Sequence, residues 1–158
     1  MATPHSRARL LHNPLLGLAL LASPAFADCR EDAELAAAFM NQYLALIVET
    51  PERDVTQWLR EQPLASAELA EAYAAEQARG RAIDAEMGWG VDLLLDAQDS
   101  PDQGFTLAQC GPAPEHVQLR GIDWAEFRVT LRLADTPQGR RVAGAGRINI
   151  NEAERAPR

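Results

Sequence analysis

The chain of 158 residues contains no lysine, so all 15 of its basic residues are arginines. Against 23 acidic residues, they leave a formal net charge of −8. Nucleic acid is a poor partner for so acidic a chain, because binding to phosphates requires clustered basic side chains. The charge is also uneven. Residues 28–104 carry 17 acids and 5 arginines, whereas residues 105–158 carry 6 acids and 8 arginines.

Side chains for nucleophilic or metal chemistry are scarce. Of the three histidines, His5 and His12 lie in a predicted leader, which leaves His116. No G-x-S-x-G nucleophile motif occurs, and the two cysteines and His116 lack zinc-site spacing. These absences argue against a Ser-His-Asp hydrolase and a zinc site, and we expect neither a metal nor a cofactor. His116 itself is expected at an exposed strand end.

Long apolar runs are absent except at the start of the chain. Arg7 and Arg9 form a basic beginning, residues 15–22 form an apolar run, and residues 25–27 read Ala-Phe-Ala. This order is typical of a signal peptide over residues 1–27, cleaved before Asp28. The alternative is a retained anchor, but the run is shorter than the roughly 20 residues that span a bilayer. We expect a periplasmic or secreted protein of a Gram-negative bacterium, with no membrane span after cleavage.

Only two cysteines are present, Cys29 and Cys110, and both follow the predicted cleavage site. An oxidising compartment and an even number of cysteines predict one disulfide between them. Two free, buried thiols are the alternative. A redox-active pair is disfavoured because the chain has no C-x-x-C motif.

Apolar periodicity divides the remaining chain into a helical half and a strand half. Spacings of three and four predict a first helix and a short second one, and Ser66 is placed to cap a third that Gly80 interrupts. Alternating apolar residues then predict four strands. The pattern indicates an α+β domain over residues 28–151, with helices packed on a curved four-stranded antiparallel sheet, and a disordered tail over residues 152–158. The predicted helices cover 31–49, 52–60 and 66–87, and the predicted strands cover 105–110, 116–120, 126–133 and 141–150.

Three segments carry a resemblance to a known family. They are residues 39–44 (Phe-Met-Asn-Gln-Tyr-Leu), residues 92–99 (Asp-Leu-Leu-Leu-Asp-Ala-Gln-Asp) and residues 147–150 (Arg-Ile-Asn-Ile). With them the chain resembles a family of secreted bacterial proteins of unknown function within the nuclear-transport-factor-two-like (SnoaL-like, cystatin-like) superfamily. That resemblance implies a cone-shaped fold with a cavity between the first helix and the sheet. It implies no particular reaction.

Carboxylates concentrate in the segment that joins the two halves, with aspartates at positions 92, 96, 99 and 102. We expect one or two helical turns here, which would place Asp92 and Asp96 on one face. Some members of the superfamily resemble proton-transferring enzymes, so Asp92 or Asp96, with Tyr43 and Trp89 nearby, are candidate catalytic residues. The alternatives are that Tyr43 and Trp89 belong to the core while the aspartates face water, or that the aspartates form a loose Ca²⁺ or Mg²⁺ site.

Arginines recur on the polar register of the predicted strands. An exposed face of this kind can dock an acidic partner protein, an anionic envelope polymer or the acidic helical half of a second copy, although an ordinary solvated face is an equal alternative. The candidate partner-binding residues are Arg120, Arg128, Arg132, Arg141 and Arg147.

Together these features predict a monomeric or dimeric binding module that recognises or inhibits another envelope or secreted protein, such as a toxin or hydrolase, and is not an enzyme. The alternative is a cone-fold enzyme or small-molecule carrier that uses an inward aspartate on an apolar ligand. That alternative requires an open interior, which Phe39, Phe127 and Leu131 would fill if they point inward.

Overall fold

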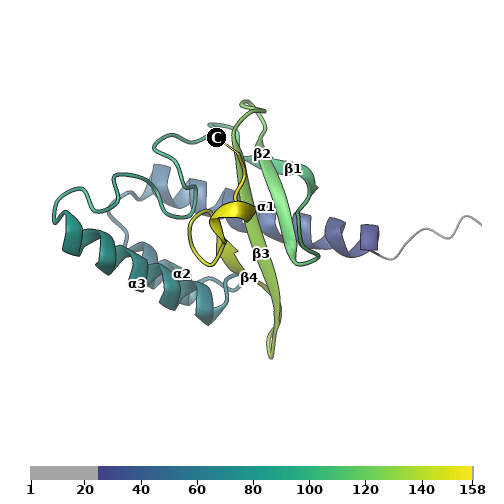
Figure 1. Ribbon diagram of the computed structural model, residues 1–158, viewed down its shortest axis with the longest axis horizontal. Helices are drawn as coiled ribbons and strands as arrows, with labels where there is room; N and C mark the ends of the chain where they lie inside the picture. Colours follow the sequence, from purple (N-terminus) through teal and green to yellow (C-terminus); the bar gives the residue numbers. More distant parts are fainter. Residues whose placement is uncertain (1–24, 158) are drawn as a thin grey trace, which may run out of the picture.

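The computed structural model describes residues 25–157 and confirms the α+β fold, with three helices followed by a four-stranded antiparallel sheet (Figure 1). Most of the predicted signal peptide, residues 1–24, lies outside the described residues. The elements in chain order are α1 (Ala25–Glu49), α2 (Val55–Glu61), α3 (Ala67–Ile83), β1 (Phe105–Cys110), β2 (His116–Gly121), β3 (Arg128–Thr136), β4 (Gly139–Ala145) and the 3₁₀ helix η1 (Glu152–Glu154).

α2 and α3 begin at side-chain caps. The Asp54 carboxylate accepts a hydrogen bond from the backbone N–H of Gln57, and the Ser66 hydroxyl accepts one from Leu69, as predicted for Ser66. Gly80 does not interrupt α3, which continues to Ile83. A Cβ at Gly80 would lie 2.6 Å from Cδ1 of Trp89. The glycine therefore gives the Trp89 ring room to pack against the helix.

The strands follow one another in the order β1-β2-β3-β4. β1 has the predicted bounds, but the prediction of a last strand over residues 141–150 is wrong after Ala145. There the chain turns through Gly146, which has a φ of 57°, and Ile148 folds back to pair with Ala145. The N–H of Arg147 donates to the carbonyl of Leu93 at 2.9 Å, so this turn is held by the segment that joins the two halves.

One face of the sheet is covered by α1, which crosses behind the strands in Figure 1. Phe39 and Tyr43 of this helix are fully buried, and the Trp58 ring of α2 lies 5.6 and 5.7 Å from their ring centres. Phe39, Phe127 and Leu131 all belong to the same buried cluster. The side chains expected to fill the space between the first helix and the sheet therefore do so.

The other face of the sheet is covered by the C-terminal segment, residues 146–157, which lies in front of the strands in Figure 1. The Thr130 hydroxyl donates to the carbonyl of Glu154, and Ile148, Ile150 and Ala156 are buried. Residues 152–157 thus differ from the disordered tail that the sequence predicted. The segment covers the middle of the polar register of β3, where Thr130 is only 1% exposed, while Arg128 and Arg132 on either side stay partly exposed.

Two links attach the beginning of α1 to opposite edges of the sheet. A disulfide joins Cys29 to Cys110 on β1, with the two Cα atoms 5.9 Å apart, so the predicted pairing is confirmed. On β4, the Arg140 guanidinium donates two hydrogen bonds to the Asp32 carboxylate, at 2.9 and 2.7 Å. Asp32 is 6% exposed, and such a fork-shaped pair is the strong form of ion pair. The sequence analysis did not anticipate this pair.

We predict that reducing the disulfide lowers the free energy of unfolding by about 4 kcal/mol, because it frees a long loop in the unfolded chain. The two cysteines lie 81 residues apart in the sequence. Urea unfolding with and without a reductant measures the difference. The control is the Cys29→Ser/Cys110→Ser variant, whose stability should match the reduced protein and not respond to the reductant. A loss below about 1 kcal/mol would contradict the prediction, because the chain-entropy model requires several times that value.

Candidate functional site

Tyr43 and Asp92, two of the candidate catalytic residues, do meet in the structure. The Tyr43 hydroxyl donates to Oδ2 of Asp92 at 2.5 Å, and Oδ1 accepts from the backbone N–H groups of Leu94 and Leu95 at 2.9 and 2.8 Å. The N–H of Asp92 donates to the carbonyl of Ala97 and closes the turn. Asp92 thus caps this turn and links it to α1.

Burial dominates the ionisation of this cluster. It raises the pKa of Asp92, an effect that the hydrogen bonds from Tyr43, Leu95 and Leu94 oppose. Burial also raises the pKa of Tyr43 and of Tyr73, and in both cases the negative charge of Asp92 is the second cause. Both tyrosines therefore remain protonated at neutral pH. Both Asp92 oxygens thus accept hydrogen bonds from within the fold.

Asp96 does not share a face with Asp92, and the predicted helical turns over this segment are wrong. Residues 92–97 form a turn closed by a bridge, and Asp96 has a φ of 54°. Its Oδ1 lies 3.6 Å from Nε of Arg147, whose guanidinium carbon is 5.0 Å from the centre of the Trp89 ring. The cap at Asp92 and the bond from Arg147 to Leu93 replace the helical hydrogen bonds.

The cleft beside Asp92 lies against α3 and not between α1 and the sheet. Its volume is about 200 Å³, and Tyr73, Arg81 and Trp89 are among its lining residues. Asp99 and Asp102, the other two acids of the segment, are exposed. Within residues 25–157, no three His, Cys, Asp or Glu side chains gather as metal ligands.

The five candidate arginines divide into two groups. Arg132 pairs with Glu68 at 2.6 Å, Arg147 pairs with Asp96, and Arg141 donates to the carbonyl of Arg140. Arg120 and Arg128 stand directly opposite each other on β2 and β3. Both are partly exposed, and neither has an ion pair or hydrogen bond from its side chain to the described residues.

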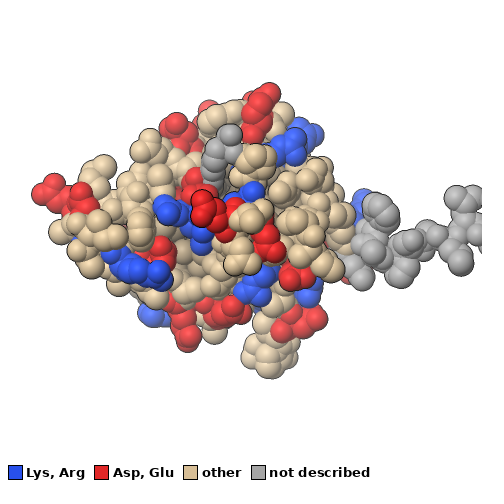
Figure 2. Space-filling view, viewed as in Figure 1, with Lys and Arg blue, Asp and Glu red and all other residues tan. Residues whose placement is uncertain are grey.

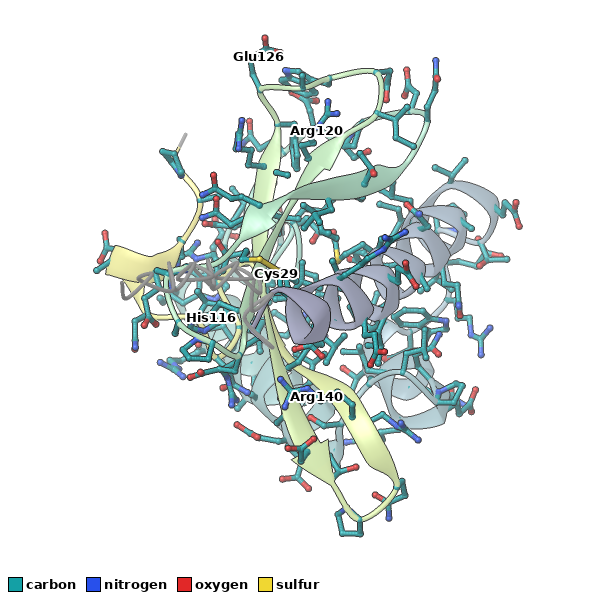
Figure 3. All side chains as sticks on the ribbon, turned by 90° about the vertical axis from the view of Figure 1, so that its right-hand side faces the viewer. Cys29, His116, Arg120, Glu126 and Arg140 are labelled. Atoms are coloured by element: carbon teal, nitrogen blue, oxygen red, sulfur yellow. A yellow bond between two sulfur atoms is a disulfide. The ribbon has the colours of Figure 1, made fainter. Side chains whose placement is uncertain are left out.

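Apolar side chains are exposed beside this arginine pair, in the connection between β2 and β3. Ile122 is 51% exposed and Trp124 is 41% exposed, with the Trp124 ring 5.2 Å from Phe127. An adjoining cleft of about 380 Å³ is lined by Trp124, Phe127, Arg128 and Pro157, and also by Ala97, Gln98, Asp99 and Glu126. We call Arg120, Ile122, Trp124, Arg128 and this cleft the hairpin-tip surface. Figure 3 shows Arg120 and Glu126 at one end of the molecule, with Arg140 toward the other.

Sequence reasoning missed Ile122 and Trp124 as surface residues, although their place between two predicted strands was a usable signal. It was wrong about His116, which is 3% exposed and whose ring nitrogens have no hydrogen-bond partner among residues 25–157. His116 pairs in register with Arg132 and lies where the C-terminal segment covers the sheet. Elsewhere on the face seen in Figure 2, acidic and basic residues are interspersed.

Comparison of the chain with family models, with curated proteins and with solved structures found no match. The resemblance to the nuclear-transport-factor-two-like superfamily therefore stays a prediction. Among the described helices, none has the length and apolar character needed to cross a bilayer.

We predict that Asp92→Asn changes how stability depends on pH. The folded state raises the pKa of Asp92. This group therefore increases the free energy of unfolding of the wild-type protein below about pH 4, and that contribution is lost as the pH rises through the raised pKa. Asparagine keeps the acceptor for Leu94 and Leu95 but cannot ionise. Urea unfolding from pH 3 to pH 8 should show the wild type losing stability relative to the variant, by about 1.4 kcal/mol per unit of raised pKa.

The control for the loss of one carboxylate is Asp99→Asn, an exposed position in the same segment. A difference between wild type and Asp92→Asn that stays constant with pH would show that burial does not control this group.

Proposed function

We propose that this protein is a binding module of the bacterial cell envelope or exterior that docks an acidic segment of another protein on the hairpin-tip surface. The observation that carries the proposal is the pair Arg120 and Arg128, which face each other across β2 and β3 with no carboxylate partner in the described residues. Like charges placed directly opposite each other destabilise a sheet. A carboxylate from a partner would relieve that repulsion.

The rest of this surface has the composition of an interaction hot spot. Tryptophan and arginine are the residue types enriched there, and arginine binds carboxylates through two parallel hydrogen bonds. The adjoining cleft of about 380 Å³ has room for an apolar side chain beside Trp124 and Phe127. We therefore infer that the docking segment carries at least one carboxylate next to an aliphatic or aromatic side chain.

Acidic residues on the same surface restrict which segments fit. Asp99 and Glu126 line the cleft with Arg128, so a uniformly acidic polymer would meet repulsion there. This favours a protein with carboxylates placed to meet the arginines over an anionic polymer, because specific interfaces use repulsion as well as attraction.

The disulfide supports a partner outside the cytoplasm. Cys29–Cys110 is compatible with an oxidising compartment outside the cytoplasm, so the partner is sought in the periplasm or the medium. The alternative of a cone-fold enzyme or carrier has less support. The hydrogen bonds of Asp92 are used within the fold, and Phe39, Phe127 and Leu131 fill the space the ligand would need.

We predict that a photo-crosslinker placed at Ile122 captures a partner in the natural host, whereas one placed at Val48, an exposed apolar position on α1, does not. With the captured partner purified, Arg120→Glu/Arg128→Glu should weaken its affinity 100-fold or more, because hydrogen bonds to charged groups contribute about 1.5–3 kcal/mol each. Isothermal titration at two salt concentrations measures this change.

Arg60→Glu is the control for a change of charge, because Arg60 is exposed on α2 with no hydrogen bond or ion pair in the described residues. This substitution should change the affinity less than twofold. An arginine placed at the partner's contacting carboxylate should restore binding to the double-glutamate variant. Capture of the partner from position 48 but not from position 122 would rule out the hairpin-tip surface as the binding site. So would an affinity that does not change in Arg120→Glu/Arg128→Glu.

A further inference from the structure

The two arginines of the hairpin-tip surface stand side by side on one face of the sheet. Arg120 and Arg128 are register partners on β2 and β3, and the Cβ atoms of such partners lie roughly 4.5–5.5 Å apart. Both side chains are partly exposed, and neither has an ion pair or hydrogen bond within residues 25–157. Two guanidinium groups at this separation can donate to the two oxygens of one carboxylate.

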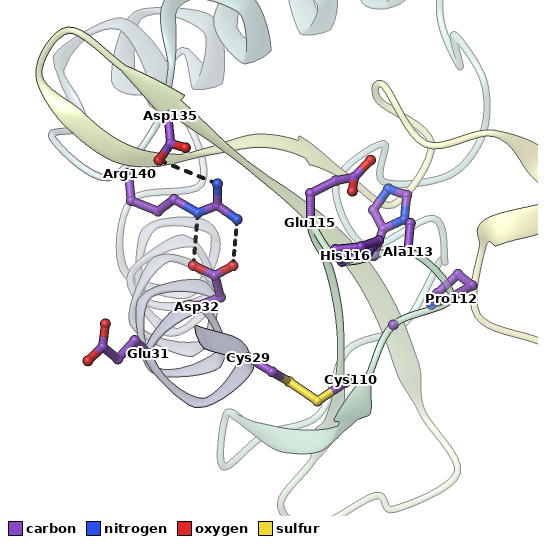
Figure 4. Close-up of a pocket in the computed structure, with 12 residues that line it drawn as sticks. Cys29, Glu31, Asp32, Cys110, Pro112, Ala113, Glu115, His116, Asp135 and Arg140 are labelled. Atoms are coloured by element: carbon purple, nitrogen blue, oxygen red, sulfur yellow. Dashed lines mark hydrogen bonds and ion pairs between the residues drawn. A yellow bond between two sulfur atoms is a disulfide. The ribbon is translucent and has the colours of Figure 1, made fainter. Parts of the chain in front are cut away.

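Arg140, toward the other end of the molecule, shows how this chain satisfies an arginine. Its guanidinium donates two hydrogen bonds to the Asp32 carboxylate, at 2.9 and 2.7 Å, and lies 3.4 Å from Asp135 (Figure 4). Arg120 and Arg128 lack such a carboxylate in the part of the chain that the structure describes. A carboxylate supplied from outside would complete the same kind of contact.

The cleft that adjoins Arg128 has a rigid apolar wall. The Trp124 ring packs against Phe127 with ring centres 5.2 Å apart, and Phe127 packs in turn against Phe105 of β1 at 5.8 Å. The backbone fixes this loop, because the Phe127 N–H donates to the carbonyl of Trp124 and the Gly121 N–H donates to the carbonyl of Phe127, both at 3.1 Å. A ligand therefore meets a wall that is already formed, which reduces the entropy lost on binding.

The carboxylate and the apolar group of the ligand must lie close together, because Arg128 lines the cleft with Trp124. Along an extended segment, neighbouring side chains point to opposite sides, and those on the same side are two residues, roughly 6–7 Å, apart. The last residue of a polypeptide differs, because its α-carboxylate and its side chain are bonded to the same Cα atom. A chain end therefore presents both groups together.

Acidic side chains limit the ligand to one carboxylate. Asp99 and Glu126 line the cleft, and neither forms an ion pair among the described residues. They would repel an aspartate or glutamate side chain that entered beside them, and repulsion of this kind contributes to specificity. The cleft thus favours an apolar last side chain, with the α-carboxylate as the only negative charge of the last residue.

We propose that the hairpin-tip surface binds the free C-terminal end of a polypeptide, with the α-carboxylate between Arg120 and Arg128 and an apolar last side chain in the cleft beside Trp124. This inference rests on the proposed function and specifies which acidic group docks. Ile122, two residues beyond Arg120, is 51% exposed and extends the apolar surface outside the cleft. That extension favours a chain end over a single small acid.

Acetylated peptides test the inference on the protein labelled with ¹⁵N-tryptophan. The Trp124 indole signal is identified by its loss in Trp124→Phe, and the signals of the other two tryptophans, Trp58 and Trp89, are internal controls. Three peptides are titrated: Gly-Gly-Gly-Leu with a free C-terminus, its amide, and Gly-Leu-Asp-Gly amide, which carries the same charge inside the chain. We expect the free acid to shift the Trp124 signal saturably and to bind at least tenfold more tightly than either amide.

Substitutions on the surface test each contact. Arg120→Gln and Arg128→Gln should each weaken binding of the free acid at least tenfold, whereas Arg60→Gln, at an exposed position on α2, should leave it within twofold. Asp99→Asn/Glu126→Gln should strengthen binding of Gly-Gly-Gly-Glu more than that of Gly-Gly-Gly-Leu. In Arg120→Glu/Arg128→Glu, a peptide that ends in arginine amide should bind more tightly than the free acid.

The inference is overturned if the leucine amide binds as tightly as the free acid, or if no peptide shifts the Trp124 signal at millimolar concentration. Equal binding of Gly-Leu-Asp-Gly amide overturns it but leaves the proposed function in place, because an internal carboxylate then suffices. The same holds if a captured partner that depends on Arg120 and Arg128 keeps its affinity without its last residue. Binding of N-acetylleucine as tight as that of the tetrapeptide would identify a small carboxylic acid as the ligand and overturn the assignment to a polypeptide end.

Discussion

Each face of the sheet packs against another part of the same chain, and the other features of the molecule depend on that constraint. α1 buries the apolar face, while residues 146–157 return across the polar face. Gly144 makes the second covering possible, because a Cβ there would lie 2.9 Å from the carbonyl oxygens of Ile148 and Asn149. The polar face, which the sequence predicts to be open, is therefore covered at Thr130 of β3 and Gly144 of β4, whereas Arg120 and Arg128 stay partly exposed.

This closure determines which charged groups remain available for a partner. Arg132 and Arg147 contact acids of the helical half and of the joining segment, so much of the predicted charge division is used within the molecule. Arg120 and Arg128 lie toward the tip of the β2–β3 hairpin and have no partner of this kind. At the opposite end, the links from Cys29 and Asp32 fix α1 against both sheet edges.

Local patterns predicted the features that short stretches of sequence determine. The bounds of β1, the cap at Ser66 and the pairing of the two cysteines follow from alternation, capping chemistry and cysteine number. Contacts between residues distant in the sequence were not predictable in this way. The bond from Arg147 to Leu93 ends the last strand early, and Asp92 caps a turn where its spacing suggested a helix.

The candidate site could be predicted only in part, because it also depends on contacts between residues distant in the sequence. Alternation placed Arg120, Arg128 and Arg132 on one register, but only the fold shows that Glu68 reaches Arg132 and leaves the other two unpaired. The burial of His116 depends on the C-terminal segment, which composition alone indicated to be a polar tail.

The reactivity of individual arginines toward phenylglyoxal, followed by mass spectrometry, tests this account most directly. Guanidinium groups held in ion pairs react slowly, so Arg120 and Arg128 should be modified well before Arg132, Arg140 and Arg147. Equal rates at Arg132, Arg147 and Arg128 would contradict the account, because they would mean that Arg132 and Arg147 are not held by Glu68 and Asp96 when the C-terminal segment packs on the sheet.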